Sequence, residues 1–222
     1  MNGPHLVYFA DPMCSWCWGF SPVVEAIGRR FGADLPVFLV LGGLRPGNRS
    51  VMGVHERDEI RTHWEHVRDA SGQPFDFSFF DRTDFVYDTE PASRAVAVMR
   101  RRSPADGLAG LRRVQRAFYA ENRDVTDPQV LCTLAGELGF DAERFGADLE
   151  SDETVRETRS DFDTAQRVGI RGFPTLIAGT GDAGAYTLIT HGFQPAERIL
   201  PGLERWLDTS TRGHAHDDHA AE

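Results

Sequence analysis

The sequence predicts an α/β fold that is interrupted by a large all-helical insertion. Strand character appears near both ends of the chain, at residues 5–10 and 35–41 and again at residues 175–178 and 185–190. Between residues 52 and 168 the pattern changes to apolar positions at helical spacing within charged sequence. Two strands before a helical block and two strands after it indicate one sheet whose connection has been extended by helices.

The N-terminal part reads as a strand–helix–strand unit. Residues 5–10 form a short apolar run, Asp11 and Pro12 form a turn, and residues 21–27 continue a helix. The next strand follows at residues 35–41, so we expect the two strands to be parallel.

The insertion is predicted to contain six helices. Pro91 and Pro128 stand at first-turn positions, and Gly72, Gly139 and Gly169 stand at helix ends. The helices are expected at residues 55–70, 91–102, 107–121, 128–138, 142–149 and 153–168.

The C-terminal part reads as a hairpin followed by a helix at residues 195–207. The linker from Gly179 to Gly184 matches G-x-G-x-x-G, but it joins two strands and opens no helix, so we interpret its glycines as turn residues. Residues 211–222 contain three His and no apolar residue larger than Ala, which predicts a disordered tail.

Two of the three cysteines, Cys14 and Cys17, lie two residues apart directly after the first strand. This position places Cys14 at a helix N-terminus, where unpaired N–H groups and the helix dipole stabilise a thiolate. Cys17 follows one turn later, close enough to attack a mixed disulfide on Cys14. The pair therefore predicts thiol–disulfide chemistry.

A structural zinc site is the main alternative reading of the cysteine pair. Such a site needs further ligands, and the candidates are Cys132, His63 and His66. Cys132 falls on the apolar side of its helix, which favours packing, and the two His occupy one helical face without an obvious third ligand. We therefore predict no metal.

Composition limits the partners and the compartment. The net charge is −10 and all 24 basic residues are Arg, which argues against nucleic acid as a partner. The absence of Lys excludes Schiff-base chemistry. The first strand begins at His5, which leaves no room for a secretory signal, and no apolar run has membrane-spanning length. We expect a cytoplasmic protein with no membrane partner.

A proline directly before the third strand completes the pattern. Pro174 follows Phe173, and together with the Cys14–Cys17 pair it resembles the thioredoxin superfamily, in which this proline is cis and faces the cysteines. The helical insertion resembles the DsbA-like branch, and residues 8–20, 41–44, 87–92, 118–120 and 172–175 are similar to its cytoplasmic, FrnE-related subgroup of predicted protein-disulfide isomerases.

This resemblance implies a domain division. Residues 1–47 and 169–210 would form a discontinuous thioredoxin-like domain, residues 48–168 a helical insertion domain, and residues 211–222 a tail. The implied activity is that of a thiol–disulfide oxidoreductase or isomerase acting on protein or small-molecule disulfides. It needs no cofactor, although glutathione could serve as a redox co-substrate.

The resemblance also implies roles for individual residues. Cys14 would be the nucleophile and Cys17 the resolving thiol, and substrate would contact Trp16, Trp18, Phe173 and Pro174. Many relatives carry a buried carboxylate six residues before the first cysteine, where this chain has Tyr8. The proton of Cys17 would then pass to water or to Asp11, two alternatives that the sequence leaves open.

Two other functions stay open at this stage. Kappa-class glutathione transferases and 2-hydroxychromene-2-carboxylate isomerases resemble the same architecture, but they characteristically use Ser at the position of Cys14. A non-enzymatic holdase or adaptor that binds extended peptides is the second alternative.

Overall fold

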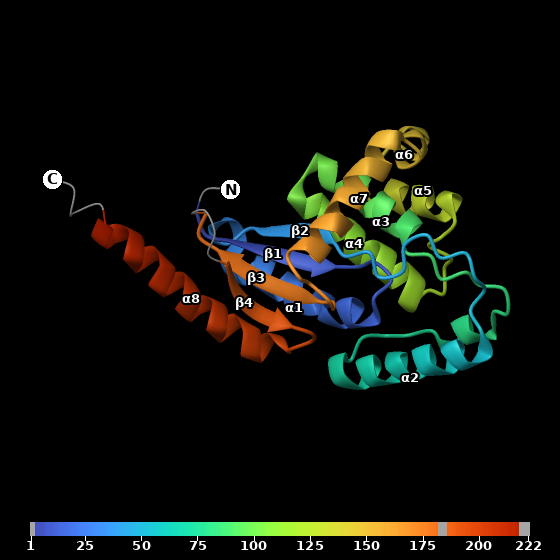
Figure 1. The fold of residues 1–222 in the computed structure, drawn as a ribbon, viewed down its shortest axis with the longest axis horizontal. Helices are drawn as coiled ribbons and strands as arrows, with labels where there is room; N and C mark the ends of the chain where they lie inside the picture. Colours follow the sequence, from blue (N-terminus) through green and yellow to red (C-terminus); the bar gives the residue numbers. More distant parts are fainter. Residues whose placement is uncertain (1–2, 182–185, 218–222) are drawn as a thin grey trace.

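A computed structural model of the chain describes residues 3–181 and 186–217, with the side chains of residues 211–217 left out. Its centre is a four-stranded mixed sheet in the order β2-β1-β3-β4 (Figure 1). The strands are β1 (His5–Ala10), β2 (Val37–Leu41), β3 (Thr175–Gly179) and β4 (Tyr186–His191). β1 is parallel to β2 and antiparallel to β3, which pairs antiparallel with β4. The predicted fold class is confirmed.

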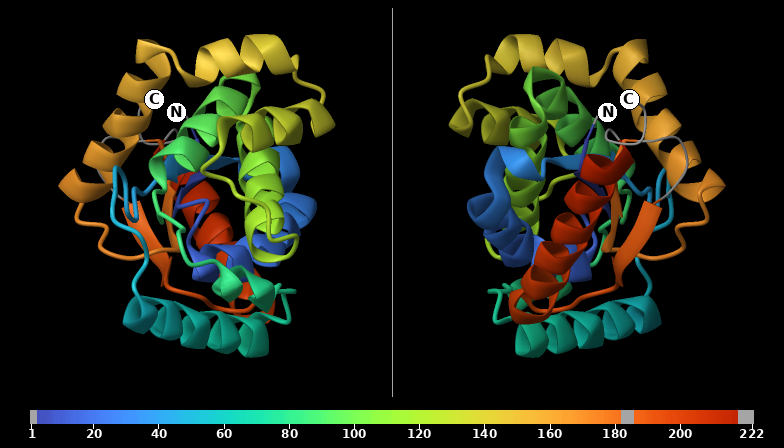
Figure 2. Two further views of the ribbon diagram at one scale, coloured as in Figure 1. Left: turned by 90° about the vertical axis from the view of Figure 1, so that its right-hand side faces the viewer. Right: turned by 90° about the vertical axis from the view of Figure 1, so that its left-hand side faces the viewer.

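Helices cover both faces of the sheet. α1 (Ser15–Phe31) and α8 (Ala196–Asp217) lie on one side, and α7 (Asp152–Arg167) lies on the other (Figures 1 and 2). Because side chains alternate along a strand, Leu6 and Tyr8 of β1 join the main core, while Val7 and Phe9 pack with Ala165 of α7. β1 is consequently buried along its whole length.

The six predicted helices between β2 and β3 are confirmed. They are α2 (Val54–Ser71), α3 (Glu90–Arg102), α4 (Pro104–Tyr119), α5 (Pro128–Glu137), α6 (Ala142–Leu149) and α7. The largest difference is at the start of α4, which lies three residues before its predicted position, and its end lies two residues before the predicted one. Ser103 caps this helix by accepting a hydrogen bond from the N–H of Asp106, and Pro104 occupies its first turn.

An aromatic cluster around Trp64 organises the part of the insertion next to α1. Trp64 of α2 is 1% exposed, and its ring stacks on Phe79 with the centroids 5.0 Å apart. Phe79 belongs to η2 (Phe77–Asp81), a 3₁₀ helix that the sequence analysis did not predict. The remaining rings in contact with Trp64 are Phe75, Phe77, Phe80, Phe118 and Tyr119.

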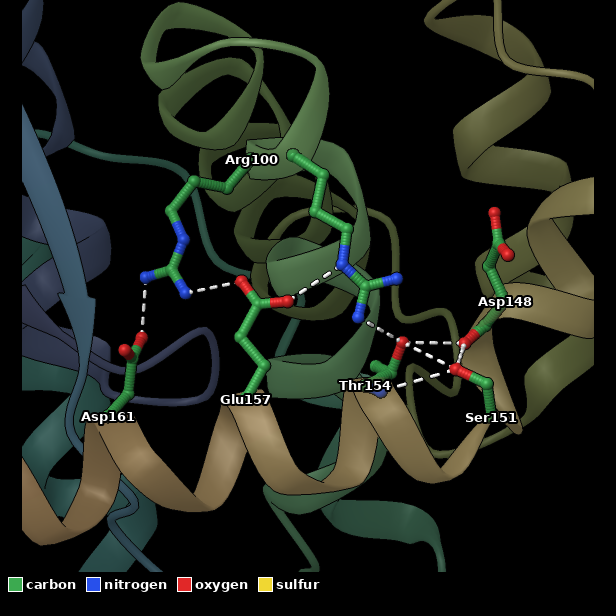
Figure 3. A network of polar contacts seen from close by, with 7 residues as sticks. Arg100, Asp148, Ser151, Thr154, Glu157 and Asp161 are labelled. Carbon is green, nitrogen blue, oxygen red and sulfur yellow. Dashed lines mark hydrogen bonds and ion pairs between the residues drawn. The ribbon is translucent and has the colours of Figure 1, made fainter.

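A polar network attaches α7 to α3 (Figure 3), and the same network reaches the edge strand β2. Arg100 of α3 lies 2.5 Å from Asp161 and 2.8 Å from Glu157, both on α7. The same guanidinium donates to the carbonyl oxygen of Leu39, and Asp161 accepts from the N–H of Leu41. The position of α7 over the sheet is thus fixed by charged groups as well as by packing.

The C-terminal region departs from one expectation. α8 continues to Asp217, so the backbone is helical through most of the segment that was predicted to be a disordered tail. Residues 218–222, residues 182–184 of the predicted linker and residue 185, predicted as the start of a strand, lie outside the described residues. None of the helices in the described part of the chain is both long and apolar enough to cross a membrane.

Candidate active site

Cys14 occupies the N-cap position of α1, four residues after the C-terminal end of β1. Its N–H donates to the carbonyl oxygen of Asp11 at 3.1 Å, which closes the turn between strand and helix. Its side chain is 7% exposed and donates from Sγ to the carbonyl oxygen of Phe173 at 3.5 Å. The first cysteine therefore lies between a helix N-terminus and the loop before β3.

Cys17 lies one turn further along α1 and is completely buried. Burial raises the pKa of its thiol, and the contact with the Cys14 thiol raises it further. Both cysteines are free thiols in this structure. The two sulfurs consequently differ in accessibility, with Cys14 on the outer side of the pair.

The loop before β3 faces the cysteines. The peptide bond between Phe173 and Pro174 is cis, and the N–H of Gly192 donates to the Pro174 carbonyl oxygen at 2.8 Å. Phe173 packs directly on Gly42, where a Cβ atom would lie 2.1 Å from the ring. Any larger residue at position 42 would push the Phe173 ring away and would disturb the contact between the Phe173 carbonyl oxygen and Cys14 Sγ.

The aromatic residues predicted to contact substrate divide into two groups. Trp16 and Phe173 are partly exposed, and Trp16 lies beside Phe193, with 5.8 Å between the ring centroids. Trp18 is only 3% exposed, and its indole N–H donates to the carbonyl oxygen of Pro74. The expectation of a substrate contact at Trp18 is corrected, because this side chain packs inside the protein and joins α1 to the loop after α2.

Asp11 is a fully buried carboxyl group next to the cysteine pair. Its two oxygens accept hydrogen bonds of 2.8 Å from the N–H groups of Met13 and Leu44. Burial raises its pKa to about 6, although these hydrogen bonds act in the opposite direction. Asp11 therefore holds the turn before Cys14 and changes its charge in mildly acidic solution.

Tyr8 places a second ionisable group beside the pair, from β1. Its side chain is 1% exposed, and its hydroxyl interacts with the Cys17 thiol. The contact is not a well-formed hydrogen bond, and the hydroxyl has no other partner within the part of the chain that the structure describes. Burial, followed by the nearby thiols, raises the pKa of this phenol far above its usual value.

The third cysteine and the candidate zinc ligands lie elsewhere in the insertion. Cys132 is partly buried on α5, and its sulfur packs so closely on Gly146 of α6 that a Cβ atom added there would lie 3.3 Å from it. Burial raises the pKa of the Cys132 thiol. His63 and His66 are exposed on α2. Among the described residues, no group of three or more His, Cys, Asp or Glu side chains is placed to hold a metal ion.

The profile of the DSBA-like thioredoxin domain matches residues 5–200. The chain belongs to this family. The match includes both cysteines, the Phe173–Pro174 loop and all six helices of the insertion, so the resemblance drawn from the sequence is confirmed at the level of the DSBA-like family.

Two solved structures resemble this DSBA-like protein along nearly its whole length. A candidate protein disulfide isomerase from Nitrosomonas europaea is 37% identical, covers 94% of this chain and 99% of its own, and has a TM-score of 0.85. The cytosolic disulfide reductase DsbM from Pseudomonas aeruginosa is 27% identical, covers 95% and 98%, and has a TM-score of 0.71. DsbM has also been solved with GSH.

Among curated proteins, the ClpXP adapter protein SpxH of Halalkalibacterium halodurans is 24% identical over 173 residues. The match covers 76% of the DSBA-like protein and 56% of SpxH. The chain thus spans little more than half the length of this relative.

Sequence reasoning singled out Cys14, Cys17, Phe173 and Pro174, and the structure brings these residues together. The resemblance placed Tyr8 where many relatives carry a buried carboxylate, and the structure puts this residue beside Cys17. Sequence reasoning did not foresee that Gly42 supports Phe173. The glycine pair after the second strand was a visible signal, since a strand that ends in two glycines often allows another segment to approach closely.

Proposed function

We propose that this protein is a thiol–disulfide oxidoreductase with Cys14 as its nucleophile and Cys17 as its resolving thiol. The observation that carries the proposal is the place of Cys14, at the N-terminus of α1 and opposite the carbonyl of Phe173. Unpaired backbone N–H groups of the first turn of α1 lie at this end of the helix, and the loop before β3 offers backbone groups beside which an extended substrate can lie.

The reaction consists of two exchanges. The Cys14 thiolate attacks a substrate disulfide, forms a mixed disulfide and releases the first substrate thiolate. Cys17 then attacks the sulfur of Cys14, forms the Cys14–Cys17 disulfide and releases the second substrate thiolate. Two external thiols, such as two glutathione molecules, reduce the pair again and leave as a disulfide.

Trp16 and Phe173 supply apolar contact area for the substrate, and the buried Pro174 shapes the loop beside which the substrate docks. Phe193 extends this area, because its ring lies next to Trp16. We propose protein or small-molecule disulfides as substrates, glutathione as a redox co-substrate and the cytoplasm as the compartment. The cytosolic reductase DsbM, with its GSH-containing structure, supports this choice.

Trapping of mixed disulfides tests the roles of the cysteines. Cys17→Ser should accumulate adducts with a scrambled protein substrate, because the internal thiol that expels the substrate is absent. Cys14→Ser should accumulate almost none, since Cys17 is buried. Non-reducing electrophoresis shows the adducts as high-mass bands that dithiothreitol removes. Cys132→Ser is the matched control and should keep its activity in insulin reduction.

The reverse pattern, with adducts on Cys14→Ser alone, would exchange the two assignments. Loss of turnover in Cys132→Ser would show that a third cysteine takes part. A glutathione transferase or isomerase is the enzymatic alternative, and conjugation of glutathione without insulin reduction would favour it.

A binding protein without turnover is the second candidate, favoured by the adapter named among the curated relatives. It predicts that the double variant Cys14→Ser/Cys17→Ser still binds partner polypeptides and suppresses their aggregation. An oxidoreductase loses its effect on disulfides in the same variant, so the two functions are separable.

A further inference from the structure

α7 carries a row of arginines on its solvent-exposed face. Arg156, Arg159 and Arg167 are all exposed, and their spacing places them on one side of the helix. They line one shallow hollow of about 480 Å³. Of the described residues that line it, Asp163 alone is acidic. This α7 arginine row therefore has a net positive charge.

The row differs from the rest of the chain in the partners of its arginines. Most of the 24 arginines form ion pairs with acidic side chains. Arg156 and Arg159 have no such partner among the described residues. Glu157 and Asp161, which are close to them in sequence, point instead toward Arg100 of α3 (Figure 3). The positive charge of the row is therefore available to a binding partner.

The C-terminal end of α7 leads directly to the redox pair. Figure 1 shows the loop that runs from this end to β3. In this loop Arg171 is exposed, has no acidic partner among the described residues, and stands two residues before Phe173. The carbonyl oxygen of Phe173 lies 3.5 Å from Cys14 Sγ. Phe162 of α7 also packs on Gly43, next to the glycine that supports Phe173. A polypeptide bound at Cys14 can therefore extend along the α7 arginine row.

The length of the row favours a polypeptide over a small anion. The helix rises about 16 Å between Arg156 and Arg167. A single carboxylate or phosphate group can bind one or two of these guanidinium groups, whereas an extended polypeptide of about five residues spans the same length. Carboxylates match the planar guanidinium group, with which they form paired hydrogen bonds. An extended segment with several Asp or Glu residues therefore fits the row.

We propose that the α7 arginine row, together with Arg171, binds acidic segments of polypeptide substrates whose disulfide reacts at Cys14. The proposal rests on the proposed oxidoreductase function and adds a substrate class to it. The substrates are proteins that carry several Asp or Glu residues close in sequence to the reacting cysteine. The row holds this acidic segment while the disulfide lies at Cys14.

The charge of the whole chain strengthens the effect of a local positive row. The net charge is −10, so most of the surface repels an acidic polypeptide while the row attracts it. Glu90 lines a neighbouring hollow together with Arg159, but it pairs with Arg94. Such an arrangement orients the substrate during encounter and increases the rate of association.

The test compares acidic and neutral peptides. In protein carrying Cys17→Ser/Cys132→Ser, Cys14 is the only cysteine. This protein reacts with peptides whose single cysteine is joined by a disulfide to thionitrobenzoate, and the released thionitrobenzoate gives a second-order rate constant. Acidic peptides carry three Glu before or after the cysteine, and neutral peptides carry Gln at the same positions. At low ionic strength at least one acidic peptide should react about fivefold or more faster than its neutral counterpart, and high salt should remove most of this difference.

Substitutions in the row should abolish the preference for acidic peptides. In the same background, Arg156→Gln/Arg159→Gln/Arg167→Gln should reduce the ratio of acidic to neutral rate constants to less than about twofold. The charge-reversed variant Arg156→Glu/Arg159→Glu/Arg167→Glu should instead react faster with a peptide in which Lys replaces the three Glu. Loss of folded protein cannot produce this reversed preference, so the second variant keeps the test decisive.

Arg29→Gln/Arg198→Gln/Arg205→Gln is the matched control, because it removes three exposed arginines of α1 and α8 and changes the net charge equally. It should keep the preference for the acidic peptide. No preference with the row intact, or equal losses in the two Gln variants, would overturn the proposal. A dimer that only the Gln substitutions in the row dissociate, without a change in the ratio, would also overturn it, since the row would then bind a second copy of this acidic chain. If no peptide releases thionitrobenzoate at Cys14, the proposed oxidoreductase function itself fails.

Discussion

At the scale of single residues, the buried carboxyl group of Asp11 holds the turn before Cys14, and its contribution to the free energy of unfolding depends on pH. The backbone N–H groups of Met13 and Leu44 bind its oxygens. Burial nevertheless dominates and raises its pKa from 3.8 to about 6. The folded protein therefore binds this proton more tightly than the unfolded chain does.

This difference predicts how Asp11→Asn changes the pH dependence of stability. A raised folded-state pKa contributes stability that is present below pH 4 and is lost as the pH rises through 6. The free energy of unfolding of the unmodified protein, minus that of Asp11→Asn, should fall by about 2 kcal/mol between pH 4 and pH 7. Urea unfolding of both proteins at several pH values measures this difference.

Asn has only one side-chain oxygen, so Asp11→Asn also loses the acceptor for one of the two backbone N–H groups. That loss lowers the free energy of unfolding by the same amount at every pH. Only the change of the difference with pH is therefore diagnostic. Parallel curves for the two proteins would mean that folding does not raise the pKa of Asp11.

The functional residues that the sequence disclosed are those whose roles depend on local spacing. Cys14 and Cys17 are separated by one helical turn, and a proline before a strand is visible in any sequence. The roles of Trp18 and Tyr8 depend on which neighbours surround them. Trp18 is covered by the loop after α2, and Tyr8 reaches Cys17 across from β1, so local pattern alone could not determine either.

At the scale of elements, Arg100 of α3 and Asp161 of α7 bind one another, and each also makes a hydrogen bond to strand β2 of the sheet. Arg100 is 18% exposed and binds Asp161, which is 16% exposed. Burial raises the pKa of Asp161, and Arg100 acts against this effect. The ion pair with Arg100 therefore stabilises the charged form of Asp161 against the effect of burial.

Replacing Arg100 by Leu should destabilise the protein by about 3–5 kcal/mol, because a buried carboxylate loses its partner. The carbonyl of Leu39 loses a hydrogen bond in the same variant. Arg30→Leu is the matched control, since its pair with Glu204 is largely exposed, and it should cost less than about 1 kcal/mol. The midpoints of urea unfolding decide the comparison, and equal losses would contradict the role given to Arg100.

Sequence reasoning placed the strands and helices well because most of their ends carry local signals. Asp127, Asp141 and Ser151 each cap a helix by accepting from a backbone N–H. The 3₁₀ helix η2 was missed although Asp76 caps it by accepting from the N–H of Ser78, because a helix of five residues is too short to show a period and its phenylalanines pack around Trp64. Tertiary contacts of this kind leave no periodic pattern.

At the scale of the whole molecule, the hydrophobic core is continuous across the division into a thioredoxin-like part and an insertion. One cluster of buried residues includes Leu6 and Leu176 of the sheet together with Val96, Phe118 and Phe145 of the insertion. Separate domains would have separate cores. The two parts therefore share the free energy of burial on which each depends.

A shared core predicts that the sheet and the insertion unfold in one cooperative transition, although a chain of 222 residues is long enough for intermediates. The test uses the double variant Trp18→Phe/Trp64→Phe, because Trp18 contacts the loop after α2 and would report on the insertion. Its tryptophan fluorescence arises only from Trp16 of α1 and Trp206 of α8. Far-UV circular dichroism of the same protein reports mainly the helices of the insertion.

The two signals should give coincident urea transitions with one midpoint and one slope, because loss of either part exposes the core of the other. Both transitions are measured on the same variant, so the stability that its substitutions remove does not affect the conclusion. A circular dichroism transition that begins at lower urea than the fluorescence transition would show that the insertion unfolds first. In that case the sheet with α1 and α8 would be stable without the insertion, and the continuity of buried side chains would not produce cooperativity.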